Sequence, residues 1–135
     1  MLVPGSSQSI MADMGEINFF RHSADLRSIE PGEVLFREGE TGDTMFAVVE
    51  GTLELSVNGH IIDEIEVGEV VGEMALIDQS PRSGTVCAKT TAVVAPVDRR
   101  YFVHLVQQHP TFALMVMEQM AERLRKANAT SDPTG

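Results

Sequence analysis

The sequence predicts a mainly β domain, a sandwich or a barrel, that is followed by helices. Three observations support this fold class. Between Glu33 and Asp98, short runs of β-forming residues alternate with turns that contain glycine. After Asp98, the apolar residues change to a helical spacing. The chain has 135 residues, of which 43% are hydrophobic, and this suits one compact domain with its own core.

The two ends of the chain are expected to lie outside this domain. Residues 1–11 begin with small and polar side chains and are interpreted as a disordered tail or a remnant of cloning. Residues 129–135 are interpreted as a second disordered tail. The domain itself is therefore assigned to residues 12–128.

The first segment of the domain, residues 12–29, predicts only a short helical piece. Its apolar anchor is small, and Pro31-Gly32 marks its end. Strands are expected after this point. That anchor comprises Ile17, Phe19 and Phe20, and the expected strands comprise residues 33–38, 44–51, 52–57, 60–67, 84–90 and 91–98.

Three features distinguish these strands from one another. Residues 44–51 are almost continuously apolar, which predicts a buried strand. Residues 52–57 alternate between apolar and polar side chains, which predicts that one face is covered. Asn58-Gly59 separates this run from the next, and both residues tolerate the positive φ of a type I′ hairpin turn.

Two helices are expected at the C-terminal end. Asp98 is a plausible N-cap for residues 99–108, and Pro110 ends that helix or starts the next one. Residues 111–128 then predict a long helix with one apolar stripe. This stripe either packs on the domain's own strands or forms a homodimer seam, with or without a ligand contact. The stripe comprises Ala113, Met117, Met120, Leu124 and Ala127.

The charge of the chain argues against a nucleic-acid surface. The formal net charge is −10, whereas nucleic acid requires a basic stripe. Carboxylates dominate from Glu30 to Glu73, and bases dominate from Arg99 to Lys126. The first interpretation of these blocks is a solvated face, and the second is that the basic segment meets the acidic strands of its own chain or a partner's.

The sequence also indicates a cytoplasmic protein. Cys87 is the single cysteine, so no internal disulfide can form. No apolar run approaches the roughly 20 residues that span a bilayer, and no secretory signal is evident. We therefore expect no membrane partner.

Residues Val71–Val86, VGEMALIDQSPRSGTV, suggest a site for a small anion. Glu73 begins one expected helical turn, whose first amides lack an intrahelical partner and attract anions. Arg82 can add a planar fork of donors to two phosphate oxygens. A carboxylate at Glu73 suits a hydroxyl beside that phosphate, as in a ribose that carries a phosphate. The alternative is that Glu73 and Arg82 form a structural ion pair in a turn.

This stretch resembles the phosphate-binding cassette of cyclic nucleotide-binding domains, a family that includes cAMP receptor proteins and protein kinase A regulatory subunits. The family pattern is Phe-Gly-Glu-(Leu/Ile)-Ala-Leu, a variable loop, and Pro-Arg-x-Ala-Thr-Val; here Val71 replaces the Phe and Gly84 replaces the Ala. PGEVLFREGETGDTMFAVVEGTLEL is similar to the family's opening strands. The resemblance covers about residues 29–127 and implies a jelly-roll-like, eight-stranded β-roll followed by B and C helices.

The resemblance also implies the roles of individual residues. By position, Glu73 would take the ribose 2′-hydroxyl and Arg82 the cyclic phosphate, to which Ser83 would add its hydroxyl. Asn128 would hydrogen-bond an exocyclic group of the base, or would be an exposed residue near a helix end; Ala127 is a second candidate there. Amides near Gly72, Met74 and Ala75 would cradle the phosphate, and Gly84 and Val86 would lie near the base.

The expected function is a regulatory module that binds a cyclic nucleotide and shifts its C-terminal helix on binding. The serine after Arg82 resembles cAMP receptors, so cAMP is expected rather than cGMP. No metal is expected. The chain stops at Gly135 without the helix-turn-helix domain of cAMP receptor transcription factors. It is therefore a stand-alone module or a piece of a larger protein, and it does not bind DNA by itself.

Two other classes of function are alternatives. One is an interaction module that keeps the cassette but no longer binds nucleotide. The other is an enzyme, which would need a metal cluster or an activated nucleophile. The histidines share no ligand spacing, and the sequence contains neither a Gly-x-Ser-x-Gly motif nor a Walker loop. We therefore expect no catalysis; these histidines are His22, His60, His104 and His109.

Overall fold

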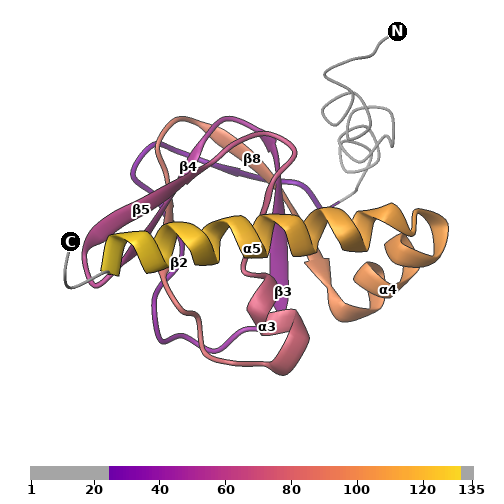
Figure 1. Ribbon diagram of the computed structural model, residues 1–135. Helices are drawn as coiled ribbons and strands as arrows, with labels where there is room; N and C mark the ends of the chain where they lie inside the picture. The colour runs from indigo at the N-terminus through magenta and orange to yellow at the C-terminus, as the bar shows by residue number, and fades with distance from the viewer. Residues whose placement is uncertain (1–24, 132–135) are drawn as a thin grey trace, which may run out of the picture.

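A computed structural model describes residues 25–131 of the chain, and these residues form a β-roll with helices packed against it (Figure 1). The eight strands of the described chain make two four-stranded antiparallel sheets, with the orders β1-β8-β3-β6 and β2-β7-β4-β5. The predicted fold class is confirmed. The strands are β1 (Arg27–Ile29), β2 (Val34–Phe36), β3 (Thr44–Glu50), β4 (Leu53–Val57), β5 (His60–Ile65), β6 (Val70–Val71), β7 (Thr85–Ala88) and β8 (Ala92–Asp98).

Strand β3 is buried on both faces, which explains its almost continuously apolar sequence. Alternate side chains of a strand point to opposite faces of its sheet. Phe46 and Val48 lie in the core between the two sheets, whereas Met45, Ala47 and Val49 lie in a second core under the helices. The strand therefore belongs to both cores and connects the roll to its helical cover.

The hairpin between β4 and β5 forms where the sequence predicts it. Val57 pairs with His60, and Asn58 and Gly59 make the turn with φ values of 53° and 83°. Both values lie in the left-handed region that a type I′ turn requires. This hairpin is confirmed.

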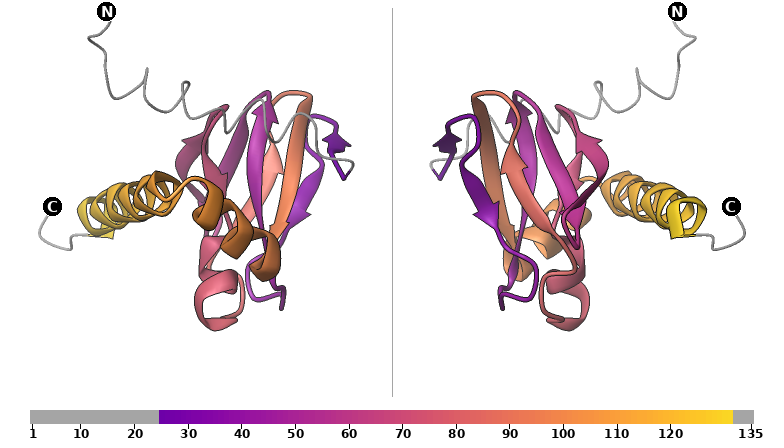
Figure 2. Two further views of the ribbon diagram at one scale, coloured as in Figure 1. Left: turned by 90° about the vertical axis from the view of Figure 1, so that its right-hand side faces the viewer. Right: turned by 90° about the vertical axis from the view of Figure 1, so that its left-hand side faces the viewer.

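Three helices follow or interrupt the strands in the described part of the chain. The short helix α3 (Glu73–Asp78) lies between β6 and β7, and α4 (Arg99–Gln108) follows β8. Asp98 caps α4 as predicted, because its carboxylate accepts the Tyr101 amide at 2.8 Å. The long helix α5 (Thr111–Ser131) passes across one side of the roll and packs on α4 and β5 (Figures 1 and 2).

The face of α5 that packs on the roll differs from the predicted stripe. Phe112, Met115 and Val116 are buried, whereas Met117 is 54% exposed and Leu124 is 62% exposed. The first turns of α5 are apolar almost all round, so periodicity alone could not choose the covered face. Of the predicted stripe, Met120 is half-buried against the core. The side chain of Ala127 lies outside the described residues.

Two elements differ from the expectation at the start of the domain and before α3. Residues 27–29, expected within a helical piece, form strand β1, which pairs with β8 at the edge of its sheet. The rest of that piece, residues 12–24, lies outside the described residues. Strand β6, which pairs with β3, was not predicted. Strands of two or three residues carry no periodic signal, and pairing with distant strands determines them.

The described helices include no segment that is long and apolar enough to cross a bilayer.

Candidate functional site

The Gly-Glu pair sits at the start of α3, as the sequence predicts. Gly72 precedes the helix with φ of 83°, a left-handed conformation that favours glycine. The amides of the first helical turn have no partner one full turn earlier, although that of Ala75 donates to the Gly72 carbonyl at 3.2 Å. At the other end of α3, the Asp78 carboxylate accepts the Ser80 amide at 3.0 Å and shapes the following loop.

Arg82 is held in place through both its backbone and its side chain. Its amide donates to the Glu40 carbonyl and its carbonyl accepts the Gly39 amide, each at 2.8 Å. These bonds tie the loop after α3 to the loop between β2 and β3. The guanidinium lies 4.2 Å from the ring centroid of Phe36, and its Nη1 donates to the Gly72 carbonyl at 3.3 Å.

Two glycines make room for the guanidinium. A Cβ atom at Gly42 would lie 2.5 Å from Arg82 Nη2, and one at Gly72 would lie 2.7 Å from Nη1. Heavy atoms do not approach so closely, so any side chain at either position would displace the guanidinium. The conformation of Arg82 therefore depends on glycines from two separate loops.

Arg82 is a buried cation without an ion pair in the described chain. Only 8% of the residue is exposed, and no carboxylate of the described residues lies within 4.0 Å of it. Burial lowers the pKa of its guanidinium from the usual value, and the more distant charges of Asp43 and Glu40 oppose this shift. An arginine side chain nevertheless stays charged in a protein. A buried and uncompensated positive charge favours an anion as its partner.

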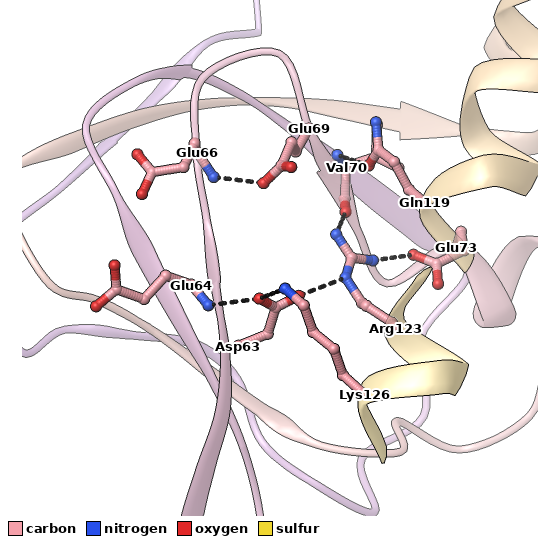
Figure 3. A network of polar contacts seen from close by, with 9 residues as sticks. All are labelled: Asp63, Glu64, Glu66, Glu69, Val70, Glu73, Gln119, Arg123 and Lys126. Atoms are coloured by element: carbon pink, nitrogen blue, oxygen red, sulfur yellow. Dashed lines mark hydrogen bonds and ion pairs between the residues drawn. The ribbon is translucent and has the colours of Figure 1, made fainter. Parts of the chain in front are cut away.

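Glu73 does not pair with Arg82; its carboxylate faces α5 instead (Figure 3). Oε1 of Glu73 accepts from Nη1 of Arg123 at 3.2 Å. The same guanidinium donates to the Val70 carbonyl and lies 3.4 Å from the Asp63 carboxylate. The alternative of a Glu73–Arg82 ion pair is therefore wrong, and Glu73 and Arg82 are available for different groups of one ligand.

These groups line one cavity of about 540 Å³, and this volume is within the range of small-molecule sites. One side of it presents Glu73, Ser80, Arg82 and Ser83. The other walls are largely apolar and come from β4, β5 and α5. The cavity can thus hold a ligand with one anionic, one hydroxylated and one apolar part; the apolar walls include Leu55, Val57, Ile62, Met120 and Leu124.

The structure brings most of the predicted ligand-binding residues to this cavity. Val86 does not line it, because its side chain is fully buried in the core between the sheets. Asn128 does not line it either; it is exposed, one helical turn beyond Leu124. The predicted residues that do line the cavity are Gly72, Glu73, Met74, Ala75, Arg82, Ser83 and Gly84.

Gly84, where the cassette pattern has alanine, lies against β4. A Cβ atom at Gly84 would lie 2.7 Å from the Ser56 carbonyl oxygen and 2.8 Å from Leu55 Cδ1. An alanine would therefore collide with this strand. The glycine permits the close approach of the cassette to β4.

The sequence interpretation missed several cavity residues, among them Phe36, Ile62 and Arg123. Arg123 could have been inferred from the charge blocks, because the basic C-terminal segment does meet acidic strands of its own chain. Arg123 and Lys126 both contact Asp63 of β5. Phe36 and Ile62 carry no comparable signal, because apolar side chains of a core and of a cavity wall look alike in a sequence.

No group of three or more His, Cys, Asp or Glu side chains is placed to hold a metal ion in the described part of the chain. The polar groups of the cavity are instead a guanidinium, a carboxylate, hydroxyls and amides. Groups of this kind can bind and orient a ligand by hydrogen bonds and charge.

Two curated proteins are similar to this chain over 72% of its length. It is 37% identical over 97 residues to the cyclic nucleotide-gated potassium channel mll3241 of Mesorhizobium japonicum. It is 33% identical over 101 residues to the cAMP-dependent protein kinase regulatory subunit of Yarrowia lipolytica. In each case the chain spans 27% of the relative's length.

The solved structure of cAMP-bound PfPKA-R (141-441) has the same fold. Its TM-score is 0.72 at 23% identity, and the match covers 94% of this chain and 48% of that one. Residues 26–109 of this chain match the family described as Cyclic nucleotide-binding domain. This match spans more than half of the sequence and includes the whole cassette, so the chain belongs to the cyclic nucleotide-binding domain family.

Proposed function

We propose that this chain is a non-catalytic regulatory module that binds cAMP in the cavity beside α3 and moves α5 on binding. The proposal rests mainly on the environment of Arg82. Its guanidinium is buried in the wall of the cavity and has no ion pair among the described residues. A cyclic phosphate supplies the missing negative charge. Two of its oxygens match the fork geometry of arginine.

The remaining groups of the nucleotide have candidate partners around Arg82. Ser83 and the first amides of α3 border the proposed phosphate position. Glu73 would accept the ribose 2′-hydroxyl, because only its Oε1 has a hydrogen-bond partner in the described chain. The base would lie against the apolar wall formed by Leu55, Val57 and Met120. Each of these contacts is part of the proposal.

The preference for cAMP rests on two observations. Serine follows Arg82, as in cAMP receptors, and the wall proposed for the base is apolar. Guanine carries an additional exocyclic carbonyl and ring N–H, which an apolar wall would leave without partners at a cost. One curated relative is named as a cAMP-dependent kinase regulatory subunit, which agrees with this choice.

The position of α5 over the cavity supports the proposed movement of this helix. Met120, Ala121 and Leu124 line the cavity, and Arg123 joins the helix to Glu73. A nucleotide that contacts these residues binds the closed helix more tightly than an open one. Such differential affinity is what shifts a conformational equilibrium.

Hydrogen–deuterium exchange with and without nucleotide tests this proposal. We expect cAMP to slow exchange in residues 72–84 and in residues 119–126 of α5, at lower concentrations than cGMP. Protection of residues 72–84 without protection of α5 would contradict the helix movement. No protection by either nucleotide, in chain freed of bound nucleotide, would favour the interaction module instead.

We also propose a homodimer through the predicted stripe of α5, supported by the exposure of Met117 and Leu124. Pairing the same stripe from two copies would remove these side chains from water. Sedimentation equilibrium should show a dimer that Met117→Lys weakens by about tenfold or more, since a buried lysine carries a large desolvation cost. A wild-type chain that stays monomeric at high concentration would contradict this arrangement.

A further inference from the structure

Asp63 lies outside the cavity but contacts the residue that holds Glu73. It is on β5, and its side chain is largely buried. Its Oδ2 lies 3.4 Å from Nε of Arg123, and its Oδ1 accepts from Nζ of Lys126 at 2.8 Å. Oδ1 also accepts the Glu64 amide at 2.9 Å, which fixes the carboxylate relative to its own strand. Asp63 thus fixes two basic residues of α5 to the edge of the roll (Figure 3).

The three nitrogens of the Arg123 guanidinium each face a different partner. Nε faces Asp63 on β5, Nη2 donates to the carbonyl of Val70 on β6, and Nη1 donates to Glu73 on α3. The guanidinium is planar and rigid, so fixing Nε also fixes the direction of Nη1. The position of the Glu73 carboxylate therefore depends on Asp63 through one rigid group.

This arrangement leaves one oxygen of Glu73 for a ligand. Arg123 contacts Oε1, and the described residues provide no hydrogen-bond partner for Oε2. The side chains of Asp63, Arg123 and Glu73 are all largely buried, so these contacts are only weakly screened by water. Without Asp63, Arg123 and Lys126 would lose a shared negative partner, and no other described residue would hold Nε of Arg123 toward β5.

We propose that Asp63 is a positioning residue for the ribose of the nucleotide: it holds Arg123, and Arg123 orients Glu73 to accept the 2′-hydroxyl. This inference rests on the proposed function of the cavity. It predicts that substitution of Asp63 lowers the affinity for a ligand with a 2′-hydroxyl and has a much smaller effect on the affinity for a ligand without one.

The test is the affinity of the full chain for cAMP and for 2′-deoxy-cAMP, with and without Asp63→Asn. Asparagine keeps the size of the side chain and removes its charge. We expect the variant to bind cAMP about tenfold more weakly, which corresponds to part of one charge-assisted hydrogen bond. We expect less than about a twofold change in affinity for 2′-deoxy-cAMP. The variant should therefore lose most of the preference for the hydroxylated ligand that the wild type has.

Two further variants separate this relay from a general effect of charge or folding. Glu64→Gln removes the same charge from the neighbouring residue, which is exposed and pairs with Lys89 away from Arg123, and should leave both affinities unchanged. Arg123→Lys keeps the positive charge but loses the fork, and should reduce the preference as Asp63→Asn does. In the double variant with Glu73→Gln, Asp63→Asn should have little further effect.

The outcomes distinguish this inference from the function on which it rests. Equal weakening of both ligands by Asp63→Asn would show that Asp63 only holds α5 in place, and would overturn the positioning role. Unchanged affinities would overturn it as well. Equal binding of both ligands by the wild type would rule out the contact between Glu73 and the 2′-hydroxyl, and with it the role of Asp63, but would leave the nucleotide site. A wild type that binds neither would overturn both proposals.

Discussion

Arg82→Ala is expected to weaken the binding of cAMP by about 100-fold or more. A charge-assisted hydrogen bond contributes about 1.5–3 kcal/mol net, and the guanidinium is expected to make two of them with the phosphate. At about 1.4 kcal/mol for each tenfold change, their loss exceeds two decades in affinity. Calorimetric titration of the wild type and the variant measures this difference.

The same substitution should have little effect on folding, and this separates binding from stability. Arg82 is buried without an ion pair among the described residues, so its removal also removes a desolvation cost. The guanidinium packs on the Phe36 ring, and a cation–π interaction of this kind stabilises a fold by only about 0.5–2 kcal/mol. A variant that unfolds at room temperature would contradict the assignment of Arg82 to binding rather than to structure.

Gly42→Ala tests the position of the guanidinium without removing it. The added Cβ atom would lie 2.5 Å from Arg82 Nη2, so the guanidinium must move. We expect roughly a tenfold loss of cAMP affinity, since the charge remains but the fork is displaced. Thr41→Ala, an exposed change in the same loop, is the matched control.

Phe112→Ala is expected to lower the free energy of unfolding by about 3–5 kcal/mol, the usual cost of deleting a buried aromatic side chain. Phe112 is 1% exposed and packs against Phe102 of α4, with ring centroids 5.7 Å apart. It lies in the core that joins α5 to the sheets. The expected loss is a large part of the roughly 5–15 kcal/mol that typically stabilises a domain.

Urea unfolding at equilibrium measures this effect through the transition midpoint. Leu114→Ala is the matched control, because Leu114 lies on the same helix but is exposed, and it should change the free energy of unfolding by less than about 0.5 kcal/mol. Equal effects of the two substitutions would contradict the packing of α5 described here. Since α5 also lines the cavity, Phe112→Ala should weaken cAMP binding too.

Local signals in the sequence predicted much of the fold. The turn at Asn58-Gly59 and the cap at Asp98 depend on the chemistry of one or two residues, and both are confirmed. The strand at residues 44–51 was predicted to be buried from its apolar run alone. Such features need no knowledge of what packs against them, and therefore they can be predicted without a structure.

Features that depend on distant segments were harder to predict. The sequence left open which face of α5 packs on the roll, because Phe112 through Met117 are all apolar and the spacing fits more than one face. Strand β1 has only three residues and is defined by its pairing with β8. In the same way, the roles of Asp63 and Arg123 appear only when β5 and α5 lie side by side.

The candidate site shows the same division. Glu73 and Arg82 stand close together in a motif, and the motif indicated both residues together with the phosphate-bearing ribose that they would bind. The separation of their partners was not visible there: Glu73 faces Arg123, while the Arg82 guanidinium contacts the Phe36 ring and the Gly72 carbonyl among the described residues. This separation is set by tertiary structure, and it supports the view that the two residues serve different groups of one ligand.

Binding of a cyclic nucleotide in the cavity through Arg82 can be measured by calorimetric titration of the nucleotide-free chain with cAMP, with Arg82→Ala titrated in parallel. We expect micromolar or tighter binding to the wild type and a loss of about 100-fold or more in the variant. Absence of binding to folded wild type, or equal binding to both chains, would contradict this expectation.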